Sequence, residues 1–176
     1  RVEPKCPVAR QCGGCQIQEM RYEAQLAFKQ KMVQNNLERI GGLSDFEMYP
    51  VIGMETPYAY RNKAQFPVGE DKEGNIVIGF YAGRTHHIVE QTDCCIGAPE
   101  NGEVLRKVKA YMQKNQIRPY NEEHHSGIVR HILIRTGYHT KEIMVCLIVN
   151  AAKASCLKNA EQLTESLREM DGMTSV

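Results

Sequence analysis

The sequence lacks the segments that carry a protein into or across a membrane. No apolar run approaches the roughly 20 residues that span a bilayer, and the start of the chain has no secretory signal. These absences exclude a membrane-spanning helix and indicate a cytoplasmic chain. A disulfide framework is not needed either, because 176 residues, 42% of them hydrophobic, can bury a core unaided.

The common catalytic motifs are also missing. The sequence contains no phosphate-cradling glycine loop, no H-E-x-x-H pair and no serine or cysteine triad. Internal repeats, low-complexity tracts and linkers are missing as well, which indicates a single domain over 1–176. The chain therefore shows no catalytic centre of these kinds.

A strong net charge is the third absence. The formal charge is only +1, so the overall balance gives little support for a nucleic-acid partner. The distribution is uneven, however, because 104–141 carries 8 Lys and Arg against 2 Asp and Glu. Such a segment can be a phosphate-facing surface or an ordinary solvated helix face with a loop, and composition does not decide between them. The same segment holds His124, His125, His131 and His139.

Cysteines are the feature that the sequence does have. Cys6, Cys12 and Cys15 follow the spacing C-x5-C-x2-C in a chain without signs of secretion, which favours thiolates gathered on a metal over disulfides. Gly13 and Gly14 lie between the two closest cysteines, where side chains would obstruct a tight turn. These three thiolates need a fourth partner.

The fourth ligand is expected from the adjacent pair Cys94 and Cys95, only one of which is needed, because neighbouring side chains on extended backbone point to opposite sides. Zinc sites usually combine two close cysteine pairs, whereas three plus one is more typical of a 4Fe-4S cluster. We favour the cluster over zinc, and zinc over unligated thiols. Cys146 is expected to be a small core residue, and Cys156 to lie at a helix start.

Apolar periodicity predicts an α+β fold, with a largely antiparallel sheet packed with helices and an N-terminal cysteine-rich metal-binding loop. The loop covers 1–18 and the α+β scaffold 19–176. The apolar stripe of the first helix is expected to pack on the sheet, and 143–149, apolar on both faces, to be a central strand. Helices are expected over 19–40, 101–114 and 155–170, and strands over 60–68, 76–80, 85–90, 128–136 and 143–150.

One expected strand has a polar face. Over 60–68, Arg61, Lys63 and Gln65 share one side, and the apolar side chains share the other. The polar side can be a binding surface or simply the solvent side of a half-buried sheet. Arg130, His131 and Arg135 are further candidates for such a binding surface, because an unpaired charge buried in a strand would be costly.

Three segments together now suggest a family. They are Cys6-x5-Cys12-Gly13-Gly14-Cys15-Gln16, the run Tyr60-Arg61-Asn62-Lys63-Ala64-Gln65-Phe66, and the segment from Cys94 through Ile96 to Pro99. This combination resembles the central domain of the RNA (uracil-5-)-methyltransferases of the RumA and TrmA type, and closely resembles the cluster-bearing 23S ribosomal RNA branch. The resemblance covers essentially the whole chain.

The resemblance implies a 4Fe-4S cluster and ribosomal RNA as partner. The cluster would bind Cys6, Cys12, Cys15 and one downstream cysteine. In the family a proline commonly follows that downstream ligand, and Cys95 occupies its position here, so we assign the ligand to Cys94 and keep Cys95 as the alternative. The family also implies that Arg61, Lys63 and Gln65 face the RNA.

Family members transfer a methyl group from S-adenosylmethionine to carbon 5 of a uridine, after a cysteine thiolate adds to carbon 6. The resemblance implies that the S-adenosylmethionine-binding fold and this nucleophile lie beyond Val176, and a β-barrel RNA-binding domain before Arg1. We therefore expect an excised domain that is inactive alone, with no catalytic and no S-adenosylmethionine-binding residue, no protein partner and a monomeric state. The alternatives are an iron–sulfur electron-transfer module and a zinc-stabilised RNA-binding domain.

Overall fold

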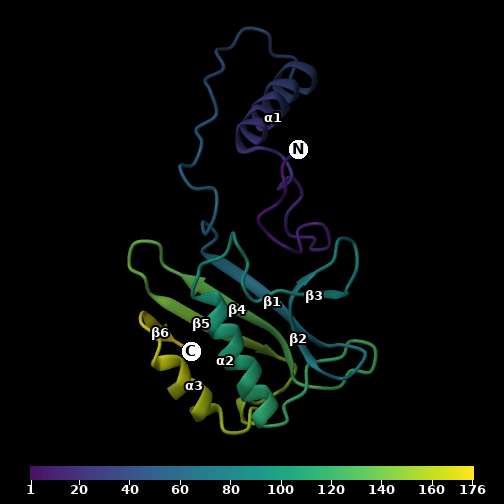
Figure 1. Ribbon diagram of the computed structural model, residues 1–176, viewed down its shortest axis with the longest axis vertical. Helices are drawn as coiled ribbons and strands as arrows, with labels where there is room; N and C mark the ends of the chain where they lie inside the picture. Colours follow the sequence, from purple (N-terminus) through teal and green to yellow (C-terminus); the bar gives the residue numbers. More distant parts are fainter.

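The computed structural model describes residues 1–176, except for the side chain of Ala154. A mixed sheet forms its lower part, with two helices on one face, and an N-terminal body stands above it (Figure 1). The six strands follow the order β3-β2-β1-β4-β5-β6, and every pairing is antiparallel except that of β5 with β6. Their bounds are β1 Lys63–Glu70, β2 Ile76–Tyr81, β3 Ile88–Glu90, β4 Val129–Thr136, β5 Ile143–Val149 and β6 Met173–Ser175. The predicted α+β class with a largely antiparallel sheet is confirmed.

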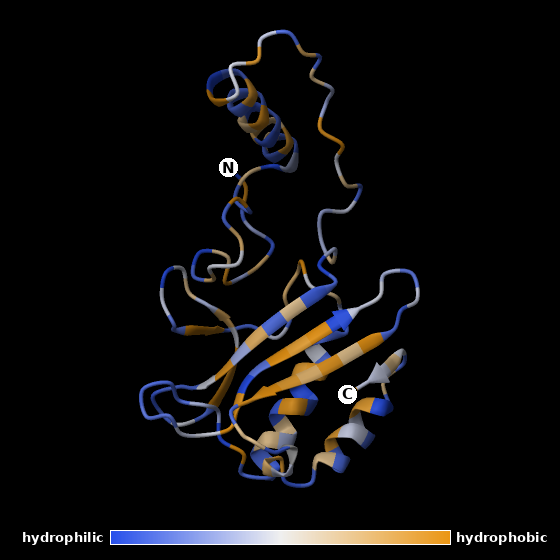
Figure 2. Ribbon diagram, turned by 180° about the vertical axis from the view of Figure 1, so that it is seen from behind, coloured by the Kyte–Doolittle hydropathy of each residue, from blue (hydrophilic) through white to orange (hydrophobic). Residues whose placement is uncertain are grey.

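Helices α2 (Asn101–Lys114) and α3 (Ala160–Arg168) cover one face of the sheet and leave the other uncovered (Figure 2). The core lies between these helices and the covered face. Its largest fully buried side chains are Phe66, Ile78, Leu105, Met112, Ile132, Ile134, Ile143 and Leu167. None of the helices in the described part of the chain has the length and apolar character that crossing a membrane requires.

Phe66 is the side chain in this core whose truncation should cost most. It is 0% exposed, and its ring centroid lies 4.8 Å from that of Phe80. We expect Phe66→Ala to lower the free energy of unfolding by about 3–5 kcal/mol, measured by urea denaturation, because the change leaves a cavity. Tyr138→Ala is the control, at a position 71% exposed, and should change it by less than about 0.5 kcal/mol. Equal effects would contradict this core.

Strand β1 contains a proline although it is an interior strand. Its first half pairs with β4 as far as Pro67, and its second half pairs with β2 from Val68 onward. Proline has no N–H to donate, so it is tolerated where a strand stops donating to one partner and starts pairing with another. Strand β1 therefore changes its pairing partner at Pro67.

The first helix forms where predicted but does not pack as predicted. Helix α1 (Tyr22–Asn35) continues as a π-helical turn, η1 (Asn36–Ile40), and Gly42 ends it in the left-handed region with φ 65°. None of the residues described in α1 or η1 is buried, and α1 points away from the sheet (Figure 1). The expectation that its apolar stripe packs on the sheet is wrong, because the long loop after η1 separates this helix from β1.

Two further expectations need correction. Cys146 is exposed, not a core residue, because it lies on the sheet face that no helix covers. The last α-helix begins at Ala160 rather than near 155, since Asn159 has a left-handed backbone with φ 54° that a continuous helix does not allow. Cys156 therefore belongs to a preceding 3-10 turn, η2 (Ala154–Cys156).

Strand β5 is interior, as predicted, but its buried residues Ile143 and Val145 lie on one face only.

Candidate functional site: a cysteine pocket beside a basic strand

Five cysteines from two distant parts of the chain line one small pocket. Cys6, Cys12 and Cys15 come from the front loop, and Cys94 and Cys95 from the segment after β3. The fold thus brings together every cysteine that the sequence analysis considered as a ligand, and leaves out Cys146 and Cys156. Further pocket residues are Gln18, Arg61, Phe80, Gln91 and Ile96.

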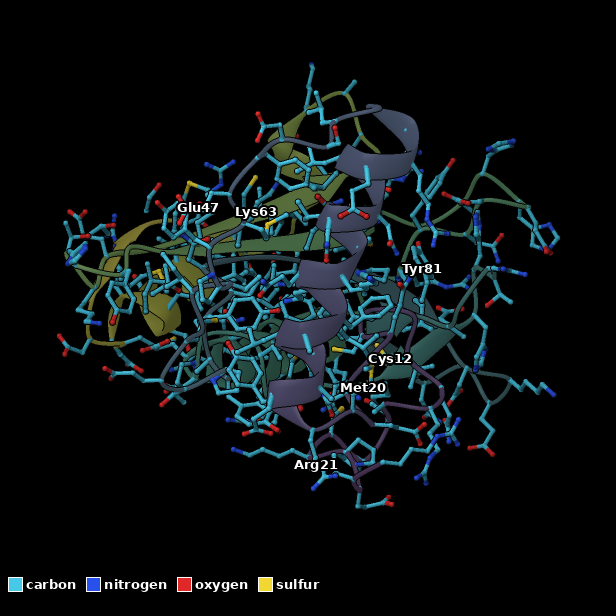
Figure 3. The ribbon with its side chains drawn as sticks, turned by 90° about the horizontal axis from the view of Figure 1, so that it is seen from above. Cys12, Met20, Arg21, Glu47, Lys63 and Tyr81 are labelled. Carbon is cyan, nitrogen blue, oxygen red and sulfur yellow. The ribbon has the colours of Figure 1, made fainter. Side chains whose placement is uncertain are left out.

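The front loop is docked on the end of β2 by its backbone. Cys12 forms an isolated antiparallel bridge with Ala82, and the Gly13 N–H donates to the Tyr81 carbonyl at 2.9 Å. Figure 3 shows Cys12 and Tyr81 on the same side of the molecule when it is seen from above. A Cβ at Gly13 would lie 2.9 Å from the Tyr81 oxygen and 3.1 Å from the backbone of Gly83, so a side chain here would push the loop off the strand.

This close approach gives a testable substitution. We expect Gly13→Ala to weaken the docking by about 1–3 kcal/mol, because the new methyl group overlaps backbone that cannot turn away. Hydrogen exchange should show faster exchange of the amide at position 13 and of the loop around it. Gly83→Ala is the matched control, since a Cβ there meets nothing within 4 Å. Unchanged exchange in Gly13→Ala would show that the loop is not held in this way.

Two glutamines, missed by the sequence analysis, contact the sulfurs. Gln18 Oε1 accepts the Cys6 N–H at 2.9 Å, and Gln18 Nε2 donates to the Sγ of Cys15 at 3.7 Å and of Cys95 at 3.5 Å. Gln91 Nε2 donates to Cys6 Sγ at 3.9 Å. Cysteine spacing does not indicate these donors, although Gln18 follows Cys15 by only three residues, a nearness in the chain that could have pointed to it.

Burial is the main cause that raises the pKa of two of these thiols. For Cys15, burial is the largest cause of the raised pKa, and the nearby Cys94 and Cys95 raise it further. Burial likewise raises the pKa of Cys95, and the neighbouring Cys6 and Cys94 act in the same direction, while the hydrogen bond from Gln18 opposes them. A pocket of crowded, partly buried thiols favours protonated sulfur unless a cation is bound among them.

The arrangement does not single out one fourth ligand. The segment Cys94–Gly97 is a turn, closed by the Gly97 N–H donating to the Cys94 carbonyl at 2.9 Å. Both adjacent cysteines line the pocket, so the expectation that they point to opposite sides is wrong, because it assumed an extended backbone. Among the described side chains, no group of three or more His, Cys, Asp or Glu is placed to hold a metal ion.

The predicted alternation of β1 is present. Lys63 and Gln65 are exposed on the uncovered face, whereas Ala64 and Phe66 are buried on the other. Lys63 lies directly across from Arg135 of β4, and no ion pair of the described side chains includes either residue. Two like charges opposite each other without an acid are destabilising unless an anion binds between them.

Arg61 connects this face to the cysteines. It precedes β1, its N–H donates to the Ile96 carbonyl at 2.9 Å, and it lines the cysteine pocket. Because extended backbone rises about 3.3 Å per residue, Lys63 begins about 7 Å further along the chain. The basic end of the sheet and the cysteine pocket are therefore neighbours.

The two other candidates on β4 are less suited to bind a phosphate. Arg130 donates to Glu122 Oε1 at 2.8 Å and lies 4.8 Å from the centre of the Tyr120 ring. Burial first, and then the charge of Arg130, lower the pKa of His131, so its ring is neutral at pH 7. Arg135 is the only member of the predicted β4 trio that is both exposed and outside these described ion pairs.

Curated relatives match nearly all of this chain. An uncharacterized RNA methyltransferase of Halalkalibacterium halodurans is 52% identical over 148 residues, which are 84% of this chain and 32% of that protein. Another, of Clostridium tetani, is 41% identical over 177 residues, covering 100% of this chain and 37% of the relative. The chain thus spans about a third of the length of the curated relatives that it matches. No protein-family model matches the chain.

A solved structure agrees with these relatives. The tRNA (uracil-54, C5)-methyltransferase of Pyrococcus abyssi, in complex with S-adenosyl-L-homocysteine, has a TM-score of 0.66 and 25% sequence identity. The match covers 90% of this chain and 35% of that one. Named relatives, a shared fold and the motifs around Cys12 and Lys63 all point in one direction: the chain belongs to the RNA (uracil-5-)-methyltransferase family of the RumA and TrmA type.

Proposed function

We propose that this chain is the central domain of an enzyme that transfers a methyl group from S-adenosylmethionine to carbon 5 of a uridine in 23S ribosomal RNA. Its part is to hold the RNA and a 4Fe-4S cluster. The observation that carries the proposal is the placement of a basic pair, Lys63 and Arg135, beside a pocket of five cysteines. The relatives named as RNA methyltransferases support the general reaction class.

The donor set fits a cluster better than a single ion. Four thiolates around one zinc, at about 2.3 Å each, lie about 3.8 Å from one another, which is a compact group. In a 4Fe-4S cluster each thiolate binds a different iron, so the sulfurs lie farther apart. The choice of the cluster rests on the spacing of three cysteines plus one remote cysteine, and the pocket is lined by all of the thiols concerned. The ligands proposed are Cys6, Cys12, Cys15 and Cys94, with Cys95 as the alternative.

The cluster would act on the fold rather than on the substrate. Four protein thiolates leave no open iron position, so the bound group would supply structure by tying the front loop to the exit of β3. Arg61 lines the pocket and Lys63 follows on the strand, so a cluster bound there would lie next to the proposed RNA face. Lys63 and Arg135 would neutralise phosphates, and the Gln65 amide would contact a base or sugar on the same face.

Helix α1 supports the proposal that a larger protein completes the site. Its residues Phe28, Met32 and Val33 are each nearly half exposed, and Ile52, on the loop after the helix, is 96% exposed. A helix without buried side chains gains little stability from packing. We place this apolar surface against the rest of the longer protein, which would also supply the S-adenosylmethionine site and the nucleophilic cysteine.

The chain alone is therefore expected to be inactive. With tritiated S-adenosylmethionine and unmodified 23S ribosomal RNA, the longer protein should incorporate label, and residues 1–176 alone should give none above background. The missing methyl-donor site and nucleophile are the reason. Label in uridine with the isolated chain would contradict this division of roles.

The substrate itself is tested in cells. Deleting the gene for the longer protein should remove 5-methyluridine from one or more positions of 23S ribosomal RNA, mapped by mass spectrometry of nuclease fragments. Loss confined to transfer RNA would contradict the ribosomal substrate while leaving the reaction class intact. No change in either RNA would contradict the proposed function.

A further inference from the structure

A single side chain, Gln18, joins the separate segments of the cysteine pocket. Its Oε1 accepts the Cys6 N–H at 2.9 Å, and its Nε2 donates to the sulfurs of Cys15 at 3.7 Å and Cys95 at 3.5 Å. The last of these contacts spans 77 residues of sequence. Gln18 is thus in contact with the start of the front loop, its end and the turn after β3.

We propose that Gln18 is a positioning residue that closes the front loop on the cluster and, through N–H···S hydrogen bonds, raises the reduction potential of that cluster. The inference rests on the proposed cluster and assigns a role to a residue that is not a ligand. It acts through the sulfurs, not on the substrate.

The chemistry of the amide explains why this position holds glutamine. A carboxamide presents an acceptor to the Cys6 N–H and a donor to the sulfurs at the same time. The neighbouring carboxylate, Glu19, accepts a hydrogen bond from Arg10 at 2.7 Å and is held away in an ion pair. A carboxylate at position 18 would instead bring negative charge toward thiolates, which repel it.

The direction of the effect follows from charge. One-electron reduction adds a negative charge to the cluster and its thiolates without making or breaking a covalent bond. An N–H donor directed at a ligand sulfur stabilises the more negative state more strongly, so it raises the potential. Other donors reach the sulfurs singly: the Gly14 N–H to Cys12 at 3.4 Å and Gln91 Nε2 to Cys6 at 3.9 Å. Gln18 reaches one proposed ligand, Cys15, and also Cys95, the alternative fourth ligand.

Two substitutions separate the two roles of Gln18. Gln18→Met keeps the length of the side chain and removes both hydrogen-bonding groups. Gln18→Glu keeps an oxygen that accepts the Cys6 N–H but has no donor for the sulfurs. Gln18→Glu also adds a negative charge, which lowers the potential by itself, so Gln18→Met, which adds none, carries the test of whether the residue acts on the sulfurs. If it acts on the sulfurs, both variants should have a lower potential.

The measurement is a redox titration of the anaerobically prepared longer protein, followed by electron paramagnetic resonance, with iron content determined for each variant. We expect a fall that corresponds to about a tenfold change in the reduction equilibrium, about 59 mV for one electron. Gln16→Met is the control, because Gln16 is exposed and makes none of the side-chain contacts described for Gln18. It should leave both iron content and potential unchanged.

The outcomes separate this inference from the proposed function. Absence of iron from the unchanged protein would contradict the cluster itself. Iron present, with both Gln18 variants at the unchanged potential, would overturn the inference alone. A shift in Gln18→Met with none in Gln18→Glu would also overturn it, since anchoring would then suffice. Loss of iron from both variants, with iron kept in Gln16→Met, would support the closing role.

Discussion

Replacing Cys12 or Cys15 by serine is expected to remove nearly all iron from the protein. Both thiols lie in the loop that is docked on β2, and both line the pocket. A serine hydroxyl is a harder and far more weakly acidic ligand than a thiol, so a site that needs four thiolates loses one of its ligands. Iron and acid-labile sulfide analysis of anaerobically purified protein should fall from about four atoms per chain to near zero.

The control for this experiment is Cys146→Ser, because Cys146 is exposed on the uncovered sheet face and does not line the pocket. It should keep its full iron content. Cys94→Ser and Cys95→Ser, measured separately, decide the fourth ligand, and we expect Cys94→Ser to release the iron. Iron retained in every single variant of the front loop would contradict the ligand assignment as a whole.

Reversing both charges of the basic pair is expected to weaken binding of ribosomal RNA. In the double variant Lys63→Glu, Arg135→Glu, two cations without acidic partners among the described side chains become anions on the exposed face. Each lost phosphate contact should lower the slope of log affinity against log salt by about 0.7 for single-stranded RNA. Fluorescence anisotropy across a salt series should therefore show weaker binding and a slope smaller by about 1.4.

A second double variant controls for net charge. Lys72 lies in the hairpin between β1 and β2, and Arg168 on α3, which covers the opposite face of the sheet; both are exposed. Lys72→Glu, Arg168→Glu changes the total charge by the same amount away from the proposed RNA face. It should alter affinity and slope much less. Equal loss in the two double variants would show that RNA responds to overall charge and not to this surface.

Local pattern predicted much of the scaffold. Alternation over 60–68 placed Phe66 in the core and Lys63 and Gln65 on the polar face, because a strand with one buried side has a strict period of two. It did not reveal that β1 changes partners at Pro67, which depends on two other strands. The helix predicted over 19–40 is found over 22–40 as α1 and η1, since its apolar periodicity lies within the segment itself.

Which elements pack against a given residue, by contrast, could not be inferred from the sequence pattern. The apolar residues of α1 predict burial equally well against a sheet of this chain or against another part of a longer protein, and only the structure shows that the sheet does not cover them. Cys146 was assigned to the core because its strand is apolar on both faces, but the helices cover one face only. Both errors arise from the arrangement of whole elements.

The cysteine pocket shows the same difference between what local sequence pattern predicts and what only the folded chain shows. Spacing grouped Cys6, Cys12 and Cys15 and selected the 94–95 pair as partners, and the fold brings all five together. The turn at Cys94–Gly97, which directs both neighbours into the pocket, could not be inferred from an assumed extended strand. Gln18 was missed because its partners are a backbone amide and two sulfurs whose proximity exists only in the folded chain.

Metal analysis of the unaltered chain, purified without oxygen, is the most direct measurement of what this pocket holds. Inductively coupled plasma mass spectrometry with sulfide determination and an absorption spectrum should give about four iron and four sulfide per chain and a broad band near 400 nm that bleaches on reduction. One zinc per chain without iron, or thiols free of any metal, would contradict the cluster on which the account of this domain depends.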